Sequence, residues 1–173
     1  MRALSGVALT AALLLGAEPL AARADASTPA SDDARQIRAL LDGFARAFHD
    51  RDVPAIMSMY APGEDLVAYD VVPPLQYRGY AAYQQDYAAF LAQFAGPITV
   101  EYRDMHVGAS GDVGYAFGLE RMAGKLTSGE ASDMWVRFTS VFRKIGGRWY
   151  DVHDHISVPA DLASGKAMMA LTP

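Results

Sequence analysis

The sequence contains no cysteine among its 173 residues. The protein therefore cannot use a disulfide, a thiol nucleophile, a zinc–thiolate site or a lipid anchor on an N-terminal cysteine. Basic residues are also sparse, because 15 Lys and Arg stand against 20 Asp and Glu without forming a basic run. This charge balance argues against nucleic acid and anionic membrane as partners.

Long hydrophobic runs are lacking except at the N-terminus. Arg2 supplies a positive start, Ala3 to Leu15 is mostly apolar, and Ala22-Arg23-Ala24 fits a small-x-small cleavage pattern. The apolar run is too short to span a bilayer. We interpret residues 1–24 as a signal peptide cut after Ala24, or alternatively after Ala26, and the other reading is a disordered or helical extension. Cleavage would leave a secreted or periplasmic protein of one domain.

The first half of the remaining chain has helical patterning. Residues 25–31 are small and polar and indicate a linker, after which Ser31 can cap a long amphipathic helix. Asp52 can cap a second, short helix that Pro62-Gly63 ends. A third helix follows the "YRG" segment, and we expect Gly96-Pro97 to stop it.

From residue 98 the hydrophobic period changes from about 3.6 to 2, which indicates strands. One short strand is expected earlier, over "LVAYD", and the tail 160–173 is weakly patterned. Helices followed by antiparallel strands predict an α+β fold, in which three N-terminal helices cover one face of a curved antiparallel sheet and enclose a cavity for a small hydrophobic molecule. The four longer strands are expected at Ile98 to Val107, Val113 to Lys125, Ala131 to Lys144 and Arg148 to Ser157.

The segment "RWYDVHDHISVP" places polar residues at every second position of the last strand. A two-residue loop at Gly146-Gly147 would put His153 and His155 on the same face as Phe138. A three-residue loop with a bulge reverses that relation and pairs apolar with apolar, so we prefer it. In this register Asp154 faces the core, whereas Trp149, Asp151, His153 and His155 lie on the outer face.

An outer face with two Trp, two His and Arg residues is typical of a subunit interface, where Trp and Arg are enriched. We therefore expect a homodimer. A facial metal site at Asp151, His153 and His155 is the alternative, but no further ligand is evident, and we predict no metal. The residues assigned to the interface are Trp135, Arg137, Trp149, His153 and His155.

The order of elements, with "YAPGEDLVAYD", "YRG" and "GGRWYDVHDHISVP", resembles the nuclear transport factor 2-like superfamily. Within it the chain is most similar to the SnoaL-like, or ketosteroid-isomerase-like, group over residues 32–159. The C-terminal motif also resembles the association domain of calcium/calmodulin-dependent kinase II, a non-catalytic oligomerisation module. The resemblance implies a cone-shaped fold with an inner cavity, and a dimer formed through the outer face of the sheet.

The resemblance to ketosteroid isomerases also implies roles for single residues. The position of the general-base aspartate falls on Asp70, nine residues before Gly79. The position of the oxyanion-hole tyrosine falls on Phe44, which cannot donate a hydrogen bond, and that of the second donor falls near Thr139 or Ser140. One catalytic element is thus retained and two are altered, and an oxyanion hole is usually the larger electrostatic contribution.

Each candidate has a structural alternative. Asp70 could be a general base or a turn residue before Val71, and Asp154 could be a pocket acid or an exposed rim carboxylate. An aromatic stripe could line a pocket or only fill the core. The residues expected at the pocket, besides Asp70 and Asp154, are Phe44, Tyr60, Tyr83, Tyr87, Tyr102, Phe138 and Ser140.

Two functions remain open from the sequence. The first is a cofactor-independent isomerase, lyase or cyclase in which Asp70 moves a proton and hydroxyl groups stabilise the developing charge. The second is a non-catalytic module that binds a small molecule or assembles oligomers. The retained carboxylate favours the first, and the missing oxyanion donors favour the second.

Overall fold

The computed structural model describes residues 31–173, so the predicted signal peptide and nearly all of the predicted linker lie outside the described residues. Helix α1 spans Asp32–Asp50, and the Ser31 hydroxyl accepts a hydrogen bond from the Ala34 backbone N–H at 3.1 Å. Helix α2 spans Val53–Met57 and is capped in the same way by Asp52. Both N-caps are where the sequence predicts them.

Helix α3 spans Tyr80–Leu91 and is shorter than predicted. The residues expected to stop it, Gly96-Pro97, lie inside strand β3, Phe94–Ser110. Strand β3 is at the edge of the sheet, and its pairing with β4 is irregular between Phe94 and Ile98. A proline is tolerated at such a position because no ladder hydrogen bond is lost there.

One sheet of six strands forms the body of the fold, in the order β2-β1-β6-β5-β4-β3. The pairs are antiparallel, as predicted, except β1 with β6, which run parallel. No hairpin joins β1 to β6, and turn geometry therefore does not fix their relative direction. The strands are β1 (Val67–Tyr69), β2 (Tyr77–Arg78), β4 (Val113–Leu126), β5 (Ala131–Ile145) and β6 (Arg148–Ser157).

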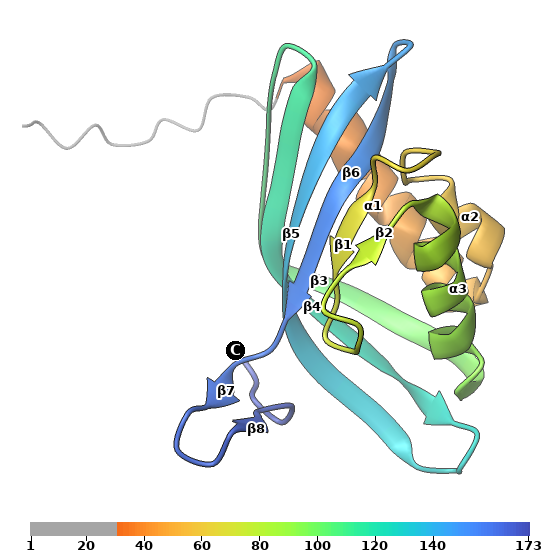
Figure 1. Ribbon diagram of the computed structural model, residues 1–173, viewed down its shortest axis with the longest axis vertical. Coiled ribbons are helices and arrows are strands. Elements are labelled where there is room, and N and C mark those ends of the chain that lie inside the picture. The colour runs from red at the N-terminus through yellow and green to blue at the C-terminus, as the bar shows by residue number, and fades with distance from the viewer. Residues whose placement is uncertain (1–30) are drawn as a thin grey trace, which may run out of the picture.

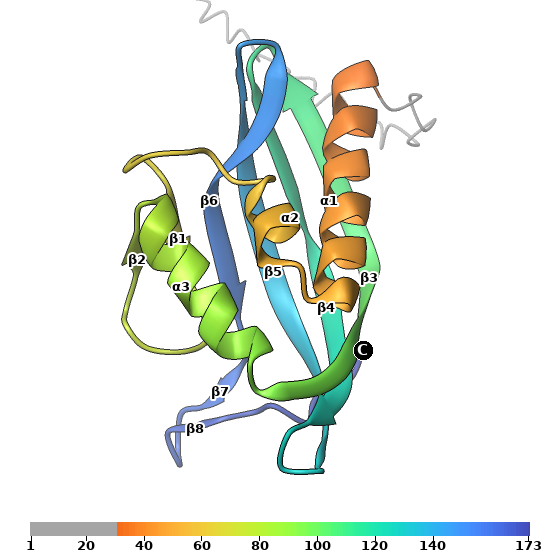
Figure 2. The ribbon, with the colours of Figure 1, turned by 90° about the vertical axis from the view of Figure 1, so that its right-hand side faces the viewer.

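The sheet is curved and open, and the three helices lie along its concave face (Figures 1 and 2). The α+β class and the layout expected for a nuclear transport factor 2-like fold are therefore confirmed. The core lies between the two layers and includes Ile37 and Phe48 of α1, Tyr83 of α3 and Phe142 of β5, which are at most 2% exposed. No helix within the described part of the chain is both long enough and apolar enough to cross a membrane.

A bulge in β3 helps to curve the sheet. The register shifts between Arg103 and His106, and Asp104 adopts a left-handed conformation with φ of 51°. Gly118 lies opposite, where a Cβ atom would come within 3.0 Å of the carbonyl oxygen of Arg103 and of the Met105 Cα. Bulges bend and twist a strand, and this one requires glycine on the neighbouring strand.

The register of β5 and β6 combines the two arrangements considered from the sequence. Ile145 pairs with Arg148, so the loop is the two-residue Gly146-Gly147 turn, in which both glycines have positive φ. The bulge lies instead at Val152, because Phe142 pairs with Asp151 whereas Val141 pairs with His153. The parity therefore changes inside β6 and not at the turn.

This position of the bulge divides the predicted outer-face residues. Beyond it, His153 and His155 pair with Val141 and Thr139 on the outer face, as expected. Before it, Trp149 and Asp151 point inward and are 2% and 0% exposed, so their predicted place on the outer face is wrong.

A small hairpin follows the domain below the sheet (Figure 1). It consists of β7, Ala160–Asp161, and β8, Lys166–Ala167, which pair antiparallel. The weak patterning of the tail did not predict it.

Candidate functional site

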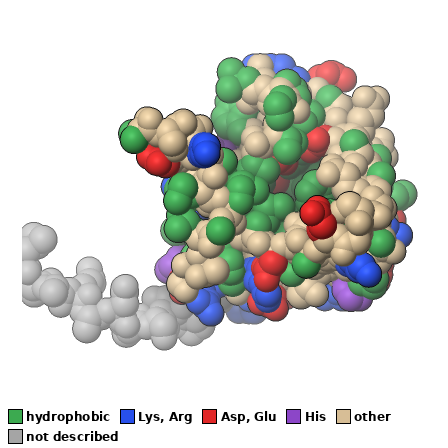
Figure 3. Space-filling model, turned by 90° about the horizontal axis from the view of Figure 1, so that it is seen from below, with side chains coloured by type: hydrophobic (Ala, Val, Ile, Leu, Met, Phe, Trp, Pro, Cys, Tyr) green, Lys and Arg blue, Asp and Glu red, His purple; other side chains and the backbone are tan. Residues whose placement is uncertain are grey.

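A cavity lies between the helices and the concave face of the sheet, with a volume of about 50 Å³. By that measure it has room for a few water molecules or a small ligand. Seen from below, hydrophobic side chains gather around a hollow in the surface (Figure 3). Its walls are mainly aromatic and aliphatic, and its polar side chains are Tyr60, Asp70, Asp86, Tyr87, Tyr102, Glu120, Ser140 and Asp154.

Asp154 lies at the centre of the polar wall. It is 4% exposed, and strand pairing places it directly opposite Ser140 on the inner face. One carboxylate oxygen accepts a hydrogen bond from the Ser140 hydroxyl at 3.1 Å. The other accepts from the hydroxyls of Tyr60 at 3.0 Å and Tyr83 at 3.2 Å. Burial raises the pKa of Asp154, and these three donors offset part of that rise.

A chain of tyrosine hydroxyls joins Asp154 to Asp70. The Tyr60 and Tyr87 oxygens are 2.6 Å apart, and Tyr87 lies 3.3 Å from Tyr83. Tyr83 also reaches a carboxylate oxygen of Asp70 at 3.3 Å. A phenol has one hydrogen, so Tyr83 can donate to Asp70 or to Asp154 but not to both at once. Burial raises the pKa of all three tyrosines well above the usual value and keeps them neutral.

Asp70 follows β1 and lies at the edge of the cavity, half-buried. Its other carboxylate oxygen accepts a hydrogen bond from the Val71 backbone N–H at 2.6 Å. Burial and the nearby charge of Asp86 raise the pKa of Asp70 to about 6. Asp70 thus makes a turn contact and also lies on the cavity wall. The two interpretations from the sequence, a turn residue and a general base, are therefore compatible.

Glu120 is a carboxyl group on the cavity wall that the sequence reasoning missed. It lies on β4, is 5% exposed, and makes no side-chain hydrogen bond with any residue in the described range. Burial, with the charges of Asp154 and Asp70, raises its pKa to about 8. The sequence contains a signal for this position. Residues two and four apart on a strand share a face, so Glu120 points to the same side of β4 as Ala116 and Met122, which are both buried.

Asp151 is the second buried acid that points inward from β6. Neither of its oxygens has a hydrogen-bond partner of good geometry among the described residues. Burial and the neighbouring Asp154 charge raise its pKa well above the usual value, while Ser140 and the His153 backbone N–H lower it slightly. It does not line the cavity.

The structure brings together most of the residues predicted at the pocket. Tyr83 does not reach the cavity wall but is joined to it by hydrogen bonds. Phe44 lies on the wall without a polar group, so no donor replaces the family tyrosine at that position. The predicted residues on the wall are Phe44, Tyr60, Asp70, Tyr87, Tyr102, Phe138, Ser140 and Asp154.

The outer face carries the remaining interface candidates. Trp135 lies under the Arg103 guanidinium at 5.4 Å, and Arg137 is exposed. His153 and His155 pack edge-on against Tyr69, with ring centroids 4.9 and 5.7 Å away.

Trp149 instead packs in the core and donates its ring N–H to Asp33 at 3.2 Å. Within residues 31–173 no group of three His, Asp or Glu side chains is arranged to hold a metal ion.

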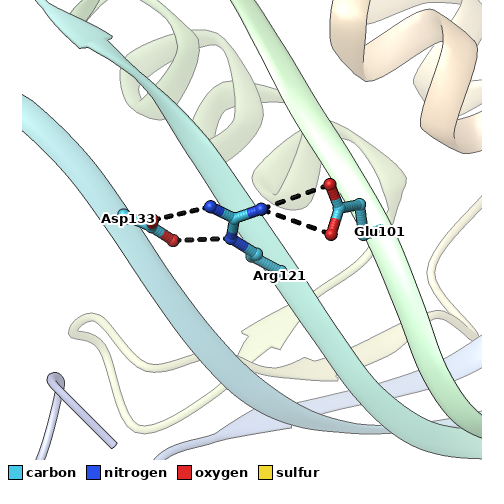
Figure 4. A network of polar contacts seen from close by, with 3 residues as sticks. All are labelled: Glu101, Arg121 and Asp133. Carbon is cyan, nitrogen blue, oxygen red and sulfur yellow. Dashed lines mark hydrogen bonds and ion pairs between the residues drawn. The ribbon is translucent and has the colours of Figure 1, made fainter. Parts of the chain in front are cut away.

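An exposed ion-pair network crosses three strands (Figure 4). Arg121 of β4 donates two parallel hydrogen bonds to Asp133 of β5, both at 2.8 Å, and contacts Glu101 of β3 at 3.2 Å. The Arg121 guanidinium lowers the pKa of Asp133. Exposed pairs of this kind contribute little to stability. Arg121 alternates with Glu120 and Met122 along β4, so the network lies on the face of the sheet opposite to the cavity.

Comparison with known proteins identifies the family. A sequence profile of the SnoaL-like domain matches residues 37–161. The chain belongs to the SnoaL-like family. No curated protein matches this SnoaL-like chain.

Several solved structures resemble it. A nuclear transport factor 2-like protein of unknown function from Pseudomonas putida KT2440 is 33% identical, with a TM-score of 0.73, covering 82% of this chain and 96% of that one. A proposed dehydratase from Streptomyces avermitilis is 20% identical, with a TM-score of 0.63 over 72% and 95%. A proposed calcium/calmodulin-dependent kinase II association domain from Xanthomonas campestris is 22% identical, with a TM-score of 0.66 over 79% and 95%.

The Pseudomonas putida protein confirms the superfamily, the other two share the fold, and none of the three assigns a reaction. A SnoaL-like fold hosts unrelated functions, so the function must be argued from the cavity of this chain.

Proposed function

We propose that this SnoaL-like protein is a cofactor-independent enzyme of the isomerase, lyase or cyclase kind, which moves a proton on a small hydrophobic molecule. The observation that carries the proposal is the position of Asp70. Its carboxylate lies at the wall of an aromatic cavity, with a raised pKa and a hydrogen bond to Tyr83. A carboxylate with a pKa of about 6 is ionised at neutral pH and is a stronger base than an exposed aspartate.

The tyrosine chain supports the chemistry in a second way. When Asp70 takes a proton from a substrate, it no longer needs the Tyr83 hydrogen, which can then bond fully to Asp154. The reverse shift would stabilise the ionised Asp70. Tyr83 therefore acts as a positioning residue that can follow the charge of the base without being deprotonated.

The cavity wall sets the kind of substrate. Aromatic and aliphatic side chains such as Phe44, Phe90 and Phe138 favour an apolar body. The proposed step requires an acidic C–H bond near Asp70. The proposed proton transfer needs no cofactor, because the chain itself supplies the base and the hydroxyl groups.

The test is catalysis of hydrogen exchange at carbon. Wild-type protein is incubated in D₂O with small apolar ketones and nitroalkanes, and loss of the acidic C–H signal is followed by NMR. The rate should rise with pH through about 6, because the base must be ionised. Asp70→Asn should lower the rate by about 10²- to 10⁴-fold.

The control is Asp133→Asn, which removes an exposed carboxylate on the opposite face and should leave the rate unchanged. Wild-type exchange no faster than that of Asp70→Asn, for every compound in the set, would contradict the enzyme proposal. Ligand binding without exchange would then favour the non-catalytic binding module.

A further inference from the structure

We propose that Glu120 is the general acid that faces Asp70 across the same cavity, and that the substrate is a carbonyl compound whose oxygen lies against Glu120. This inference rests on the proposed function and names its substrate class. Asp70 comes from the loop after β1, whereas Glu120 comes from β4, with β6 and β5 between them in the sheet. A molecule that fills the cavity would therefore meet Asp70 at one side and Glu120 at the other, with Asp154 of β6 on the sheet between them.

The surroundings of Glu120 leave its carboxyl group free for a ligand. Its neighbours across the strands are Tyr102 on β3 and Val136 on β5. The Tyr102 hydroxyl is directed to the Leu41 carbonyl at 3.5 Å and so does not bond to Glu120. A buried carboxyl group without a partner loses free energy unless a hydrogen-bonding group reaches it, and the cavity is the place from which one can come.

The charge state suits a donor. With a pKa of about 8, Glu120 remains protonated at pH 7, whereas Asp70, with a pKa of about 6, is ionised. Environments that separate two carboxyl groups in this way assign one as acid and the other as base.

The titratable groups around the cavity determine this state. Among residues 31–173, no lysine, arginine or histidine lines the cavity, so no cation from this part of the chain favours an ionised Glu120 there. The groups that face it are Tyr102 of β3, Asp154 of β6, Tyr60 after α2, Asp70 after β1, and Asp86 and Tyr87 of α3.

The step balances as an enolisation. Asp70 takes the proton from the carbon next to the carbonyl, and the C–H electron pair forms the new C=C bond. The carbonyl π electrons move to oxygen, which takes the Glu120 proton. The products are an enol, protonated Asp70 and ionised Glu120. Return of the Asp70 proton to another carbon of a conjugated enol, with the oxygen proton going back to Glu120, completes an isomerisation.

The test compares two variants of Glu120 in the same exchange assay. Wild-type exchange of ketones should rise through about pH 6 and fall through about pH 8. Glu120→Gln keeps a donor but cannot titrate, so the fall near pH 8 should disappear. Glu120→Met removes the donor and should slow ketone exchange by about 10²- to 10³-fold. Nitroalkane exchange should slow much less, since a nitronate needs no proton on oxygen.

The matched control is Glu101→Gln on β3, an exposed glutamate that contacts Arg121, which should leave the pH profile unchanged. Binding gives a readout independent of turnover. The affinity for cyclohexanone, followed by its carbonyl carbon shift, should weaken above pH 8 in wild type but not in Glu120→Gln.

The outcomes separate the two proposals. Binding with this pH dependence but without exchange would contradict the enzyme function and keep Glu120 as the anchor of a carbonyl oxygen. In the second outcome, exchange depends on Asp70, but the exchange rate of Glu120→Gln still falls near pH 8. That result would overturn only the role of Glu120 and would leave the enzyme function in place. Cyclohexanone affinity that is equal in wild type and Glu120→Met would also overturn it.

Discussion

The inward-facing acids Asp151, Asp154 and Glu120 differ in the partners that their positions supply. Asp154 has three hydroxyl donors, Glu120 faces the cavity, and Asp151 has no well-placed partner among the described residues. Burial opposes ionisation in each case, so the pKa of each carboxyl group is raised. Residues of one chemical type therefore acquire different properties from their neighbours.

Asp151 gives a prediction about stability. The pKa of Asp151 is raised in the folded state. Its contribution to the free energy of unfolding is therefore fully present below the unfolded pKa of 3.8 and is lost as pH rises toward the folded pKa. Relative to wild type, Asp151→Asn should gain about 1.4 kcal/mol of unfolding free energy for each pH unit in that range. Urea unfolding between pH 4 and 8 measures this difference.

Asp133→Asn is the control of opposite sign. The pKa of Asp133 is lowered by Arg121, so its stabilisation is present above 3.8 and is lost as pH falls. Parallel stability curves for wild type and Asp151→Asn would show that Asp151 ionises as freely in the folded protein as in the unfolded chain.

At the scale of elements, two bulges decide where side chains point. The bulge at Val152 turns Asp151 inward while leaving His153 outside, and the bulge at Asp104 bends β3 around the helices. Each bulge adds one residue, so the side chains beyond it point to the opposite face from the one that alternation predicts. The position of such a bulge cannot be predicted from the apolar and polar alternation of a single strand.

The β3 bulge predicts a specific need for glycine. Gly118→Ala should lower the unfolding free energy by about 1–3 kcal/mol, because the new methyl group meets backbone atoms that cannot move aside. Gly96→Ala, in the irregularly paired start of β3, meets no atom within 4 Å and should stay within about 0.5 kcal/mol of wild type. Chemical denaturation compares them, and equal stabilities would contradict a tight bulge.

At the scale of the whole molecule, the outer face of the sheet is the predicted dimer interface. Three of its aromatic side chains, Tyr69, Tyr115 and Phe117, are between 40% and 49% accessible, and exposed apolar patches can mark interaction sites. Trp135, Arg137, His153 and His155 share this face, so a second copy of the chain remains the predicted occupant.

Sedimentation tests the dimer. Trp135→Ala combined with His153→Ala should raise the dimer dissociation constant at least tenfold, as loss of central interface side chains commonly does. Leu162→Ala, a 94% exposed residue in the tail hairpin, should leave the constant unchanged. A double variant that sediments as wild type does would exclude this face as the interface.

The sequence by itself determined the class of fold, the caps of α1 and α2, the long strands and the inward direction of Asp154, because periodicity and capping are local properties. It also brought Asp70 forward, although only through a family resemblance. The tertiary structure decided that β1 runs parallel to β6 and that Trp149 and Asp151 belong to the core. It also decided that Glu120 faces the cavity with no hydrogen-bond partner among the described residues. Strand direction, bulge position and the absence of a partner depend on residues distant in the chain, and no local pattern records them.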